Sequence, residues 1–318
     1  MAKFYLDFEK EIVELEEKIK EKKIKLSPDD EKEKEEISIL EEKLQKMIKE
    51  TYSNLTIWQR VQLARHYNRP YTLDYISRIT ENFMELHGDR FYSDDTAIIA
   101  GLAVINGKSM IIIGHQKGRD TKGNIYRNFG MANPEGYRKA LRIMKIAEKF
   151  KKPIVTLIDT PGAFPGKGAE ERCVAEAIAK NMYEMTILKV PILCIVTGEG
   201  GSGGAIAIGL GDRVLMLENS IYSVISPEGC ASIIFRDSSK AKIAAESLKI
   251  TAYELLELGF IDGVIPEPLG GAHREVDKMA EVLKERILKE IEELEKIDTD
   301  ILIKNRIEKY SKMGYWEE

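Results

Sequence analysis

The sequence has few cysteines, and the three present, Cys173, Cys194 and Cys230, stand far apart. They form no Cys-x-x-Cys pair, which argues against a disulfide framework and a zinc ribbon. No apolar run approaches the roughly 18 residues that a membrane-spanning helix needs. A net charge of −5 and the lack of a basic block argue against specific nucleic-acid binding. The first seven residues lack the apolar core of a secretion signal, so we expect a cytoplasmic protein without a membrane partner.

What the sequence does have is enough apolar residues for a sizeable core: 43% of its 318 residues are hydrophobic. We predict three parts: a charged helical hairpin over 1–50, a main domain over 51–274 and a helical extension over 275–318. In the hairpin, Ser27 is the expected N-cap of the second helix and Pro28 its first residue. The arm either rests on its own domain or contacts another subunit. Its apolar stripes are Ile12, Leu15 and Ile19 in the first helix and Ile37, Leu40, Leu44 and Met47 in the second.

The main domain reads as an α/β fold. Two apolar runs, 96–105 and 110–114, flank Asn106-Gly107, a strong signal for a β-hairpin. The buried runs 153–158 and 191–196 each lead into a glycine-rich loop and then a helix. Successive strand–loop–helix units favour a parallel sheet, so both loops should lie at its carboxyl edge and share one crevice. Further helices are predicted over 134–149, 169–188, 239–248, 251–258 and 275–297, with a last helical segment ending at Trp316.

The loop over residues 198–205 reads Gly-Glu-Gly-Gly-Ser-Gly-Gly-Ala. Its glycines permit positive φ and leave backbone N–H groups unobstructed. One interpretation is an oxyanion hole, because the first N–H groups of a helix favour an anion. Another is a tight turn that only lets the helix approach the sheet.

Two further motifs overlap in the same loop. A G-x-G-x-x-G pattern beginning at Gly198, with Glu218 further on, is typical of a dinucleotide-binding oxidoreductase. A G-x-S-x-G pattern around Ser202 is typical of a hydrolase nucleophile, and Asp262 and His273 follow it in a suitable order. These four interpretations stay open on the local pattern alone.

The earlier loop, 159–166, also resembles nucleotide-binding motifs without completing one. Asp159-x-x-Gly162 is similar to a GTPase switch, and Gly166-Lys167 to a P-loop. Gly168, however, stands where a P-loop needs Ser or Thr. No complete Walker motif occurs in the chain, which argues against a nucleotide hydrolase.

Taken together, seven segments resemble the alpha subunit of the carboxyltransferase of bacterial acetyl-CoA carboxylase. The resemblance runs almost from end to end and is far more specific than any single glycine motif. One departure is Cys173, where we would expect glycine. The segments are RPYTLDY (69–75), GHQKGR (114–119), NFGM (128–131), PEGYRKA (134–140), IDTPGA (158–163), YSVISPEGCAS (222–232) and EPLGGAHR (267–274).

The resemblance implies a crotonase-like fold of repeated ββα units and a split active site. A beta subunit with a four-cysteine zinc ribbon would complete the site, in an alpha2beta2 heterotetramer. Carboxybiotin on the biotin carboxyl carrier protein, loaded by biotin carboxylase, would carboxylate acetyl-CoA to malonyl-CoA for fatty acid synthesis. The released biotin nitrogen would take the methyl proton and the enolate would capture CO2, without a protein base or a metal on this chain.

Two alternative functions remain open, and one expectation has no matching motif in the sequence. The substrate could instead be another short acyl-CoA such as propionyl-CoA, and an oxidoreductase is a second alternative. The resemblance also implies ATP binding in the complex, although this chain carries no complete Walker motif.

Seven residues receive roles from the resemblance. Gly203 and Gly204 would be the backbone oxyanion donors that hold the biotin ureido oxygen. Gly162 and Ala163 would shape the facing wall. A plainer interpretation makes Gly162, Gly200 and Gly201 turn formers only, and places Glu170 and Arg172 at an exposed helix start. The implied substrate-binding residues are Gly162, Ala163, Gly200, Gly201 and Arg172.

Overall fold

One mixed β-sheet forms the centre of the molecule. A computed structural model describes residues 4–27 and 30–314, and within them the sheet has eight strands in the order β1-β2-β3-β4-β5-β6-β8, with β7 paired to β5. β1, β2 and β3 are antiparallel, and the other pairings are parallel. The predicted α/β class is therefore confirmed. The strands are β1 (Asn82–Glu85), β2 (Ile98–Ile105), β3 (Lys108–His115), β4 (Ile154–Thr160), β5 (Ile192–Gly201), β6 (Arg213–Leu217), β7 (Ile221–Ser223) and β8 (Gly263–Ile265).

The hairpin between β2 and β3 lies where the sequence predicts it. Asn106 and Gly107 have φ of 47° and 73°, because a two-residue hairpin turn of this type needs positive φ at both positions. Ile105 pairs with Lys108 across the turn. Helix α6 (Pro134–Lys149) follows the two strands, and its first and last residues are those predicted. β2, β3 and α6 thus form one ββα unit.

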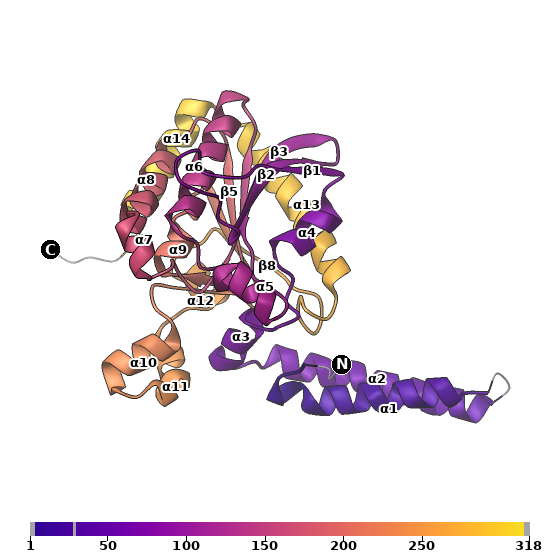
Figure 1. The fold of residues 1–318 in the computed structure, drawn as a ribbon. Coiled ribbons are helices and arrows are strands. Elements are labelled where there is room, and N and C mark those ends of the chain that lie inside the picture. The colour runs from indigo at the N-terminus through magenta and orange to yellow at the C-terminus, as the bar shows by residue number, and fades with distance from the viewer. Residues whose placement is uncertain (1–3, 28–29, 315–318) are drawn as a thin grey trace.

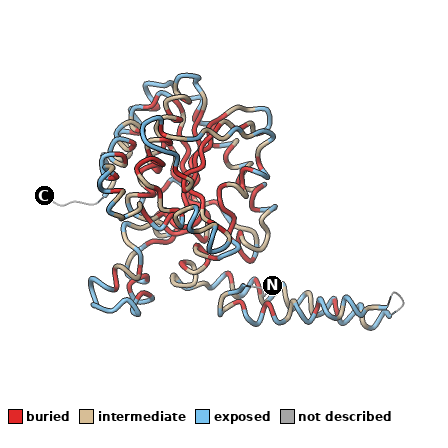
Figure 2. Tube along the Cα trace, viewed as in Figure 1, coloured by how far each residue is buried: buried red, intermediate tan, exposed pale blue. Residues whose placement is uncertain are grey.

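Helices cover both faces of the sheet (Figure 1). Alternate residues of a strand point to opposite faces, so Ile111 and Ile113 of β3 join one buried cluster and Ile112 joins the other. The first cluster includes residues of α6 and α8, and the second includes residues of α4 and α13. Burial is therefore concentrated along the strands in Figure 2. These covering helices are α4 (Thr72–Ile79), α8 (Val174–Ile187) and α13 (Val276–Glu295).

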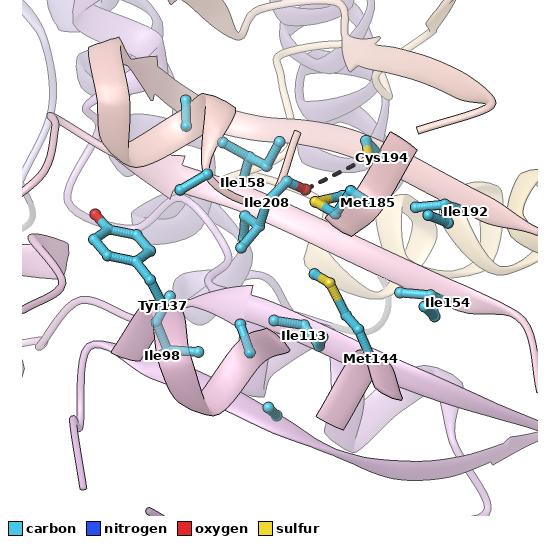
Figure 3. Packing of buried hydrophobic residues seen from close by; sticks show 14 of the residues in the cluster. Ile98, Ile113, Tyr137, Met144, Ile154, Ile158, Met185, Ile192, Cys194 and Ile208 are labelled. Carbon is cyan, nitrogen blue, oxygen red and sulfur yellow. Dashed lines mark hydrogen bonds between the residues drawn. The ribbon is translucent and has the colours of Figure 1, made fainter. Parts of the chain in front are cut away.

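Close packing on the first face is visible in Figure 3. Met144 of α6 and Met185 of α8 are fully buried with Ile154 and Ile192 of the central strands. Cys194 lies in the same cluster, where its thiol donates a hydrogen bond to the Ile208 carbonyl at 3.5 Å. All three cysteines are free thiols.

Helices α1 (Lys10–Lys25) and α2 (Glu31–Ser53) form the predicted hairpin, which extends beside the sheet domain in Figure 1. Ile12 and Ile19 are buried, as the stripe predicted. The predicted cap at Ser27 is wrong: Asp30 caps α2 by accepting the Glu33 N–H at 3.0 Å. Asp30 is the cap because it directly precedes the first turn, where the positive end of the helix dipole stabilises its carboxylate. The predicted first residue, Pro28, lies outside the described residues.

The chain closes with α13 and α14 (Thr299–Ser311). The predicted end of the last helix, Trp316, lies outside the described residues. No helix in the described ranges is long and apolar enough to cross a membrane. The remaining elements are η1 (Asp7–Glu9), α3 (Ile57–Ala64), α5 (Thr121–Tyr126), η2 (Asn128–Gly130), α7 (Lys167–Glu171), α9 (Ser202–Ile206), α10 (Pro227–Phe235), η3 (Ser238–Lys240), α11 (Ala241–Ser247) and α12 (Ala252–Glu257).

Candidate active site

The two glycine loops meet at the carboxyl ends of β4 and β5, as the parallel sheet predicted. Their contact is tight at Gly204, where an added Cβ would lie 2.6 Å from the Gly162 carbonyl carbon and 2.8 Å from the Ala163 nitrogen. No side chain fits there, so the backbone of one loop approaches the backbone of the other. Thr160 fixes the first loop by accepting the Gly162 N–H at 3.1 Å and donating to the Gly162 carbonyl at 2.8 Å.

Helix α9 begins at this contact. Its N-cap, Gly201, offers no side-chain hydrogen bond, and the first N–H groups of a helix have no partner inside it. Gly204 is buried and Gly203 is half-buried. N–H groups at such a position can bind an oxyanion, and the oxyanion role of both residues stays a prediction.

The glycines before α9 differ from the prediction of a turn with positive φ. Gly198, Gly200 and Gly201 continue β5, and among residues 198–205 only Ser202 has positive φ, at 45°. These glycines are needed for close approach instead: an added Cβ would lie 2.7 Å from the Tyr222 ring at Gly200 and 2.2 Å from the Pro161 oxygen at Gly201. β7 pairs with this extension and holds it as a strand. Their predicted contact with substrate stays a prediction.

The hydrolase and dinucleotide interpretations lose their structural context. Ser202 is exposed between a strand and a helix. His273, however, forms a hydrogen bond with Glu9, with 2.9 Å between Nε2 and Oε1. Asp262 accepts the Val214 N–H at 2.7 Å, so no triad assembles at the serine. Of the fingerprint glycines, Gly198 and Gly200 lie within β5 and Gly203 lies within α9, rather than in a turn between strand and helix.

Comparisons with known proteins decide the family. A sequence model of the family described as "Acetyl co-enzyme A carboxylase carboxyltransferase-like" matches residues 5–314. The chain belongs to this family. An acetyl-coenzyme A carboxylase carboxyl transferase subunit alpha from Chlorobaculum parvum is 56% identical, over 100% of this chain and 98% of the relative. The protein of the same name from Pasteurella multocida is also 56% identical, over 99% of this chain and 100% of the relative.

Solved structures of low identity share the fold. A Pseudomonas malonate decarboxylase hetero-tetramer chain matches with a TM-score of 0.56 and 13% identity, over 70% of this chain and 87% of that chain. Transcarboxylase 12S matches with a TM-score of 0.53 and 22% identity, over 69% of this chain. This chain spans 43% of the transcarboxylase chain. The crotonase-like fold predicted from the sequence is thus confirmed.

A charge network at the bases of the two loops, with Lys117, Asp159 and Glu199 at its buried centre, was not predicted from the sequence. Lys117 Nζ lies 2.7 Å from Asp159 Oδ1 and 2.9 Å from Glu199 Oε2. Arg65 Nε lies 2.7 Å from the other Glu199 oxygen and its Nη1 lies 2.6 Å from Glu228 Oε1. The partners of each ion pair lie far apart in the chain. The signal in the sequence was the presence of charged residues, such as Asp159 and Glu199, at the ends of apolar strands.

Ion pairing, rather than contact with solvent, keeps the buried groups of this network ionised. Burial opposes ionisation of Glu199, but Lys117 and Arg65 outweigh it and lower the pKa of Glu199 to about 2. Burial also opposes the Lys117 charge, and the two carboxylates outweigh it and raise the pKa of Lys117. Both groups therefore stay ionised near neutral pH.

Arg172, the one charged residue predicted to bind substrate, already has partners. Its Nε lies 2.6 Å from Glu135 Oε1, and its guanidinium stands 4.9 Å from the centre of the Tyr92 ring. These contacts fasten the end of α7 to α6. Its role toward substrate stays a prediction, and the structural role is the one with observed contacts.

One cluster, Glu9, His66 and His273, has the residue types of a metal site, with ligand atoms within 4.8 Å of one another. Its hydrogen bonds fit a different role. The Asn68 N–H donates to His66 Nδ1 at 3.1 Å, so the neutral ring carries its proton on Nε2, the atom that faces Glu9. Glu9 also accepts from the Tyr52 hydroxyl. We therefore assign this cluster to holding the N-terminal segment on the sheet domain.

Proposed function

We propose that this chain is the alpha half of an acetyl-CoA carboxylase carboxyltransferase, which moves a carboxyl group from carboxybiotin to acetyl-CoA and yields malonyl-CoA for fatty acid synthesis. The observation that carries the proposal is the family match over residues 5–314. The close backbone contact at Gly204 supports it, because this contact brings the loop of the proposed oxyanion donors against the loop of Gly162 and Ala163.

The chemistry assigned to this chain is orientation and charge stabilisation. The carboxybiotin supplies the carboxyl group when it is bound. The Gly203 and Gly204 N–H groups hold the ureido oxygen, and preorganised donors of this kind are usually the largest catalytic term in such sites. Gly162 and Ala163 form the opposite wall. Glu199 stays paired with Lys117, so this buried carboxylate is not the base of the reaction.

The proposal includes a partner that completes the site. Relatives carry the name "subunit alpha", which supports a multi-subunit enzyme. We propose a zinc-ribbon beta subunit in an alpha2beta2 assembly, with the biotin carboxyl carrier protein and biotin carboxylase in the wider, cytoplasmic complex. Exposed apolar side chains offer it a surface: Val224 is 83% exposed and Ile233 on α10 is 72% exposed.

Reconstitution tests the proposal. The chain is purified alone and together with the zinc-ribbon chain of the same organism, and malonyl-CoA formation is measured with carboxylated carrier protein. We expect turnover only when both chains are present. Full activity from this chain alone would contradict the split site, and a reconstituted complex that prefers propionyl-CoA would correct the substrate.

A further inference from the structure

The pairing of β4 with β5 is interrupted where the two glycine loops begin. Ile158 pairs with Val196, but Thr160 pairs with Gly200, so one residue of β4 faces three residues of β5. Such bulges re-aim the chain and are common next to active sites. The break lies at Asp159, and something other than the regular ladder must hold the strands together there.

Asp159 and Lys117 fill this break. Asp159 Oδ1 accepts the Glu199 N–H at 2.9 Å and the Lys117 ammonium at 2.7 Å. The same ammonium donates to the Glu199 carboxylate at 2.9 Å. The space is built for this contact, because a Cβ on Gly198 would lie 2.4 Å from Asp159 Oδ1 and a Cβ on Gly130 would lie 2.9 Å from Lys117 Cγ.

We propose that Lys117 is a positioning residue that fixes the two glycine loops relative to each other, because its one ammonium group joins the carboxylates at the bases of both loops. Asp159 leads directly into Gly162 and Ala163, and Glu199 leads into Gly203 and Gly204. The inference rests on the proposed function for its catalytic consequence, but the linkage of the loops is independent of it. A displacement of about 1 Å at a reacting centre typically costs about 100-fold in rate.

A matched control comes from a second buried lysine. Lys139 on α6 donates to Asp94 Oδ1 at 2.6 Å and to the Asp95 carbonyl at 2.7 Å. It is fully buried and contacts neither glycine loop among the hydrogen bonds of the described residues. Lys117→Met and Lys139→Met therefore each remove the charge of one buried, ion-paired lysine, and only Lys117 joins the loops.

The linkage is tested first on the full chain by hydrogen exchange. We expect Lys117→Met to increase exchange of the amides at 162–163 and 203–204 together, and Lys139→Met to leave both segments protected. Unchanged exchange of both segments in Lys117→Met overturns the proposal. If that variant does not fold, the double variant Lys117→Met/Glu199→Gln serves instead, because it also removes one of the two repelling carboxylates.

The catalytic consequence is tested on the reconstituted complex. We expect Lys117→Met to lower kcat about 100-fold and to raise the KM for the biotin donor, with the KM for acetyl-CoA unchanged. Without the ammonium, the Asp159 and Glu199 carboxylates face each other with Arg65 beside Glu199 only, so a proton taken up by the pair gives a hydrogen bond that joins them again. The activity of the variant relative to wild type should therefore rise as the pH falls from 8 to 6.

Three results would overturn this positioning role. They are a uniform loss shared by Lys139→Met, equal rises in both KM values, and a pH profile parallel to that of wild type. A wild-type complex that does not carboxylate acetyl-CoA would refute the proposed function instead, and the exchange experiment would still decide the linkage.

Discussion

At the scale of single residues, the glycines of the crevice were found from the sequence, but the reason for them was not. A glycine run suggests positive φ, whereas here Ser202 takes the left-handed conformation and the glycines leave space. Which residue faces another backbone depends on contacts between loops far apart in the chain. The same limit hid the contact between Lys117 and Asp159, which no local spacing encodes.

The two proposed oxyanion donors should respond differently to an added side chain. At Gly204 a Cβ would meet the backbone of Gly162 at 2.6 Å, while at Gly203 it would meet only the end of the Ile178 side chain at 3.3 Å. We expect Gly204→Val to lower turnover of the reconstituted enzyme roughly 100- to 1,000-fold, as loss of one oxyanion donor does. Gly203→Ala should lose much less. Steady-state kinetics check both, and equal losses would show that space at Gly204 is not the deciding factor.

The backbone conformation at Cys173 explains why glycine is expected at this position. It is an exposed N-cap of α8 with φ of 63°, a conformation that costs a non-glycine residue about 1 kcal/mol or more. We expect Cys173→Gly to raise the free energy of unfolding by about 1 kcal/mol, because glycine relieves this strain. Denaturant unfolding measures the change. Cys173→Ala is the control, since it keeps the Cβ, and a gain of the same size there would contradict the explanation.

At the scale of elements, periodicity predicted the strands and long helices well, because their apolar residues repeat at the spacing of the structure. The ends were predicted less well. β5 extends to Gly201, since β7 pairs with residues that have no strand-like side chains. The N-cap of α2 is Asp30 rather than the predicted Ser27, because the backbone geometry decides which residue directly precedes the first turn.

Acid should loosen the N-terminal segment from the sheet domain. Burial, His273, Arg69 and Arg274 outweigh Glu9 and lower the pKa of His66 from 6.5 to about 3. His66 binds a proton more readily once released, so the docked state loses stability as the pH falls from 6.5 toward 3. Glu9, whose pKa is lowered from 4.5 to about 2 by hydrogen bonds that outweigh burial, adds a further loss below pH 4.5.

The expected loss at pH 5 is on the order of 1–2 kcal/mol. Hydrogen exchange of α1 at pH 7.5 and pH 5, corrected for intrinsic rates and referred to α6, measures it. His66→Gln should show a weaker dependence over this range, because glutamine does not titrate. Equal protection of α1 at both pH values in the wild-type chain would contradict a linkage through His66.

At the scale of the whole molecule, successive strand–loop–helix units predicted the parallel sheet and the meeting of the two glycine loops at its carboxyl edge. The sequence did not predict how α14 packs on the sheet domain, because this packing depends on the contacts of one arginine. Arg306 of α14 is 1% exposed and forms two hydrogen bonds of 2.8 Å with Asp212. It also donates to the carbonyls of Met185, Leu188 and Val190 at 2.7 to 2.9 Å. The last helix thereby closes the edge of the core between α8 and β6.

Removing this arginine should destabilise the whole sheet domain rather than only free the last helix. Arg306→Met leaves the Asp212 carboxylate buried without its cation, and breaking such a pair costs about 3–5 kcal/mol. Lys304, on the same helix, is the control: it is exposed and lies 3.8 Å from Glu308, so Lys304→Met should change stability by less than about 0.5 kcal/mol. Urea unfolding followed by circular dichroism compares the two variants. A single cooperative transition at lower urea for Arg306→Met is expected, because Asp212 also accepts the N–H at the start of β5. If α14 alone unfolded early while the main transition stayed in place, residues 299–311 would be an appended helix and not part of the core.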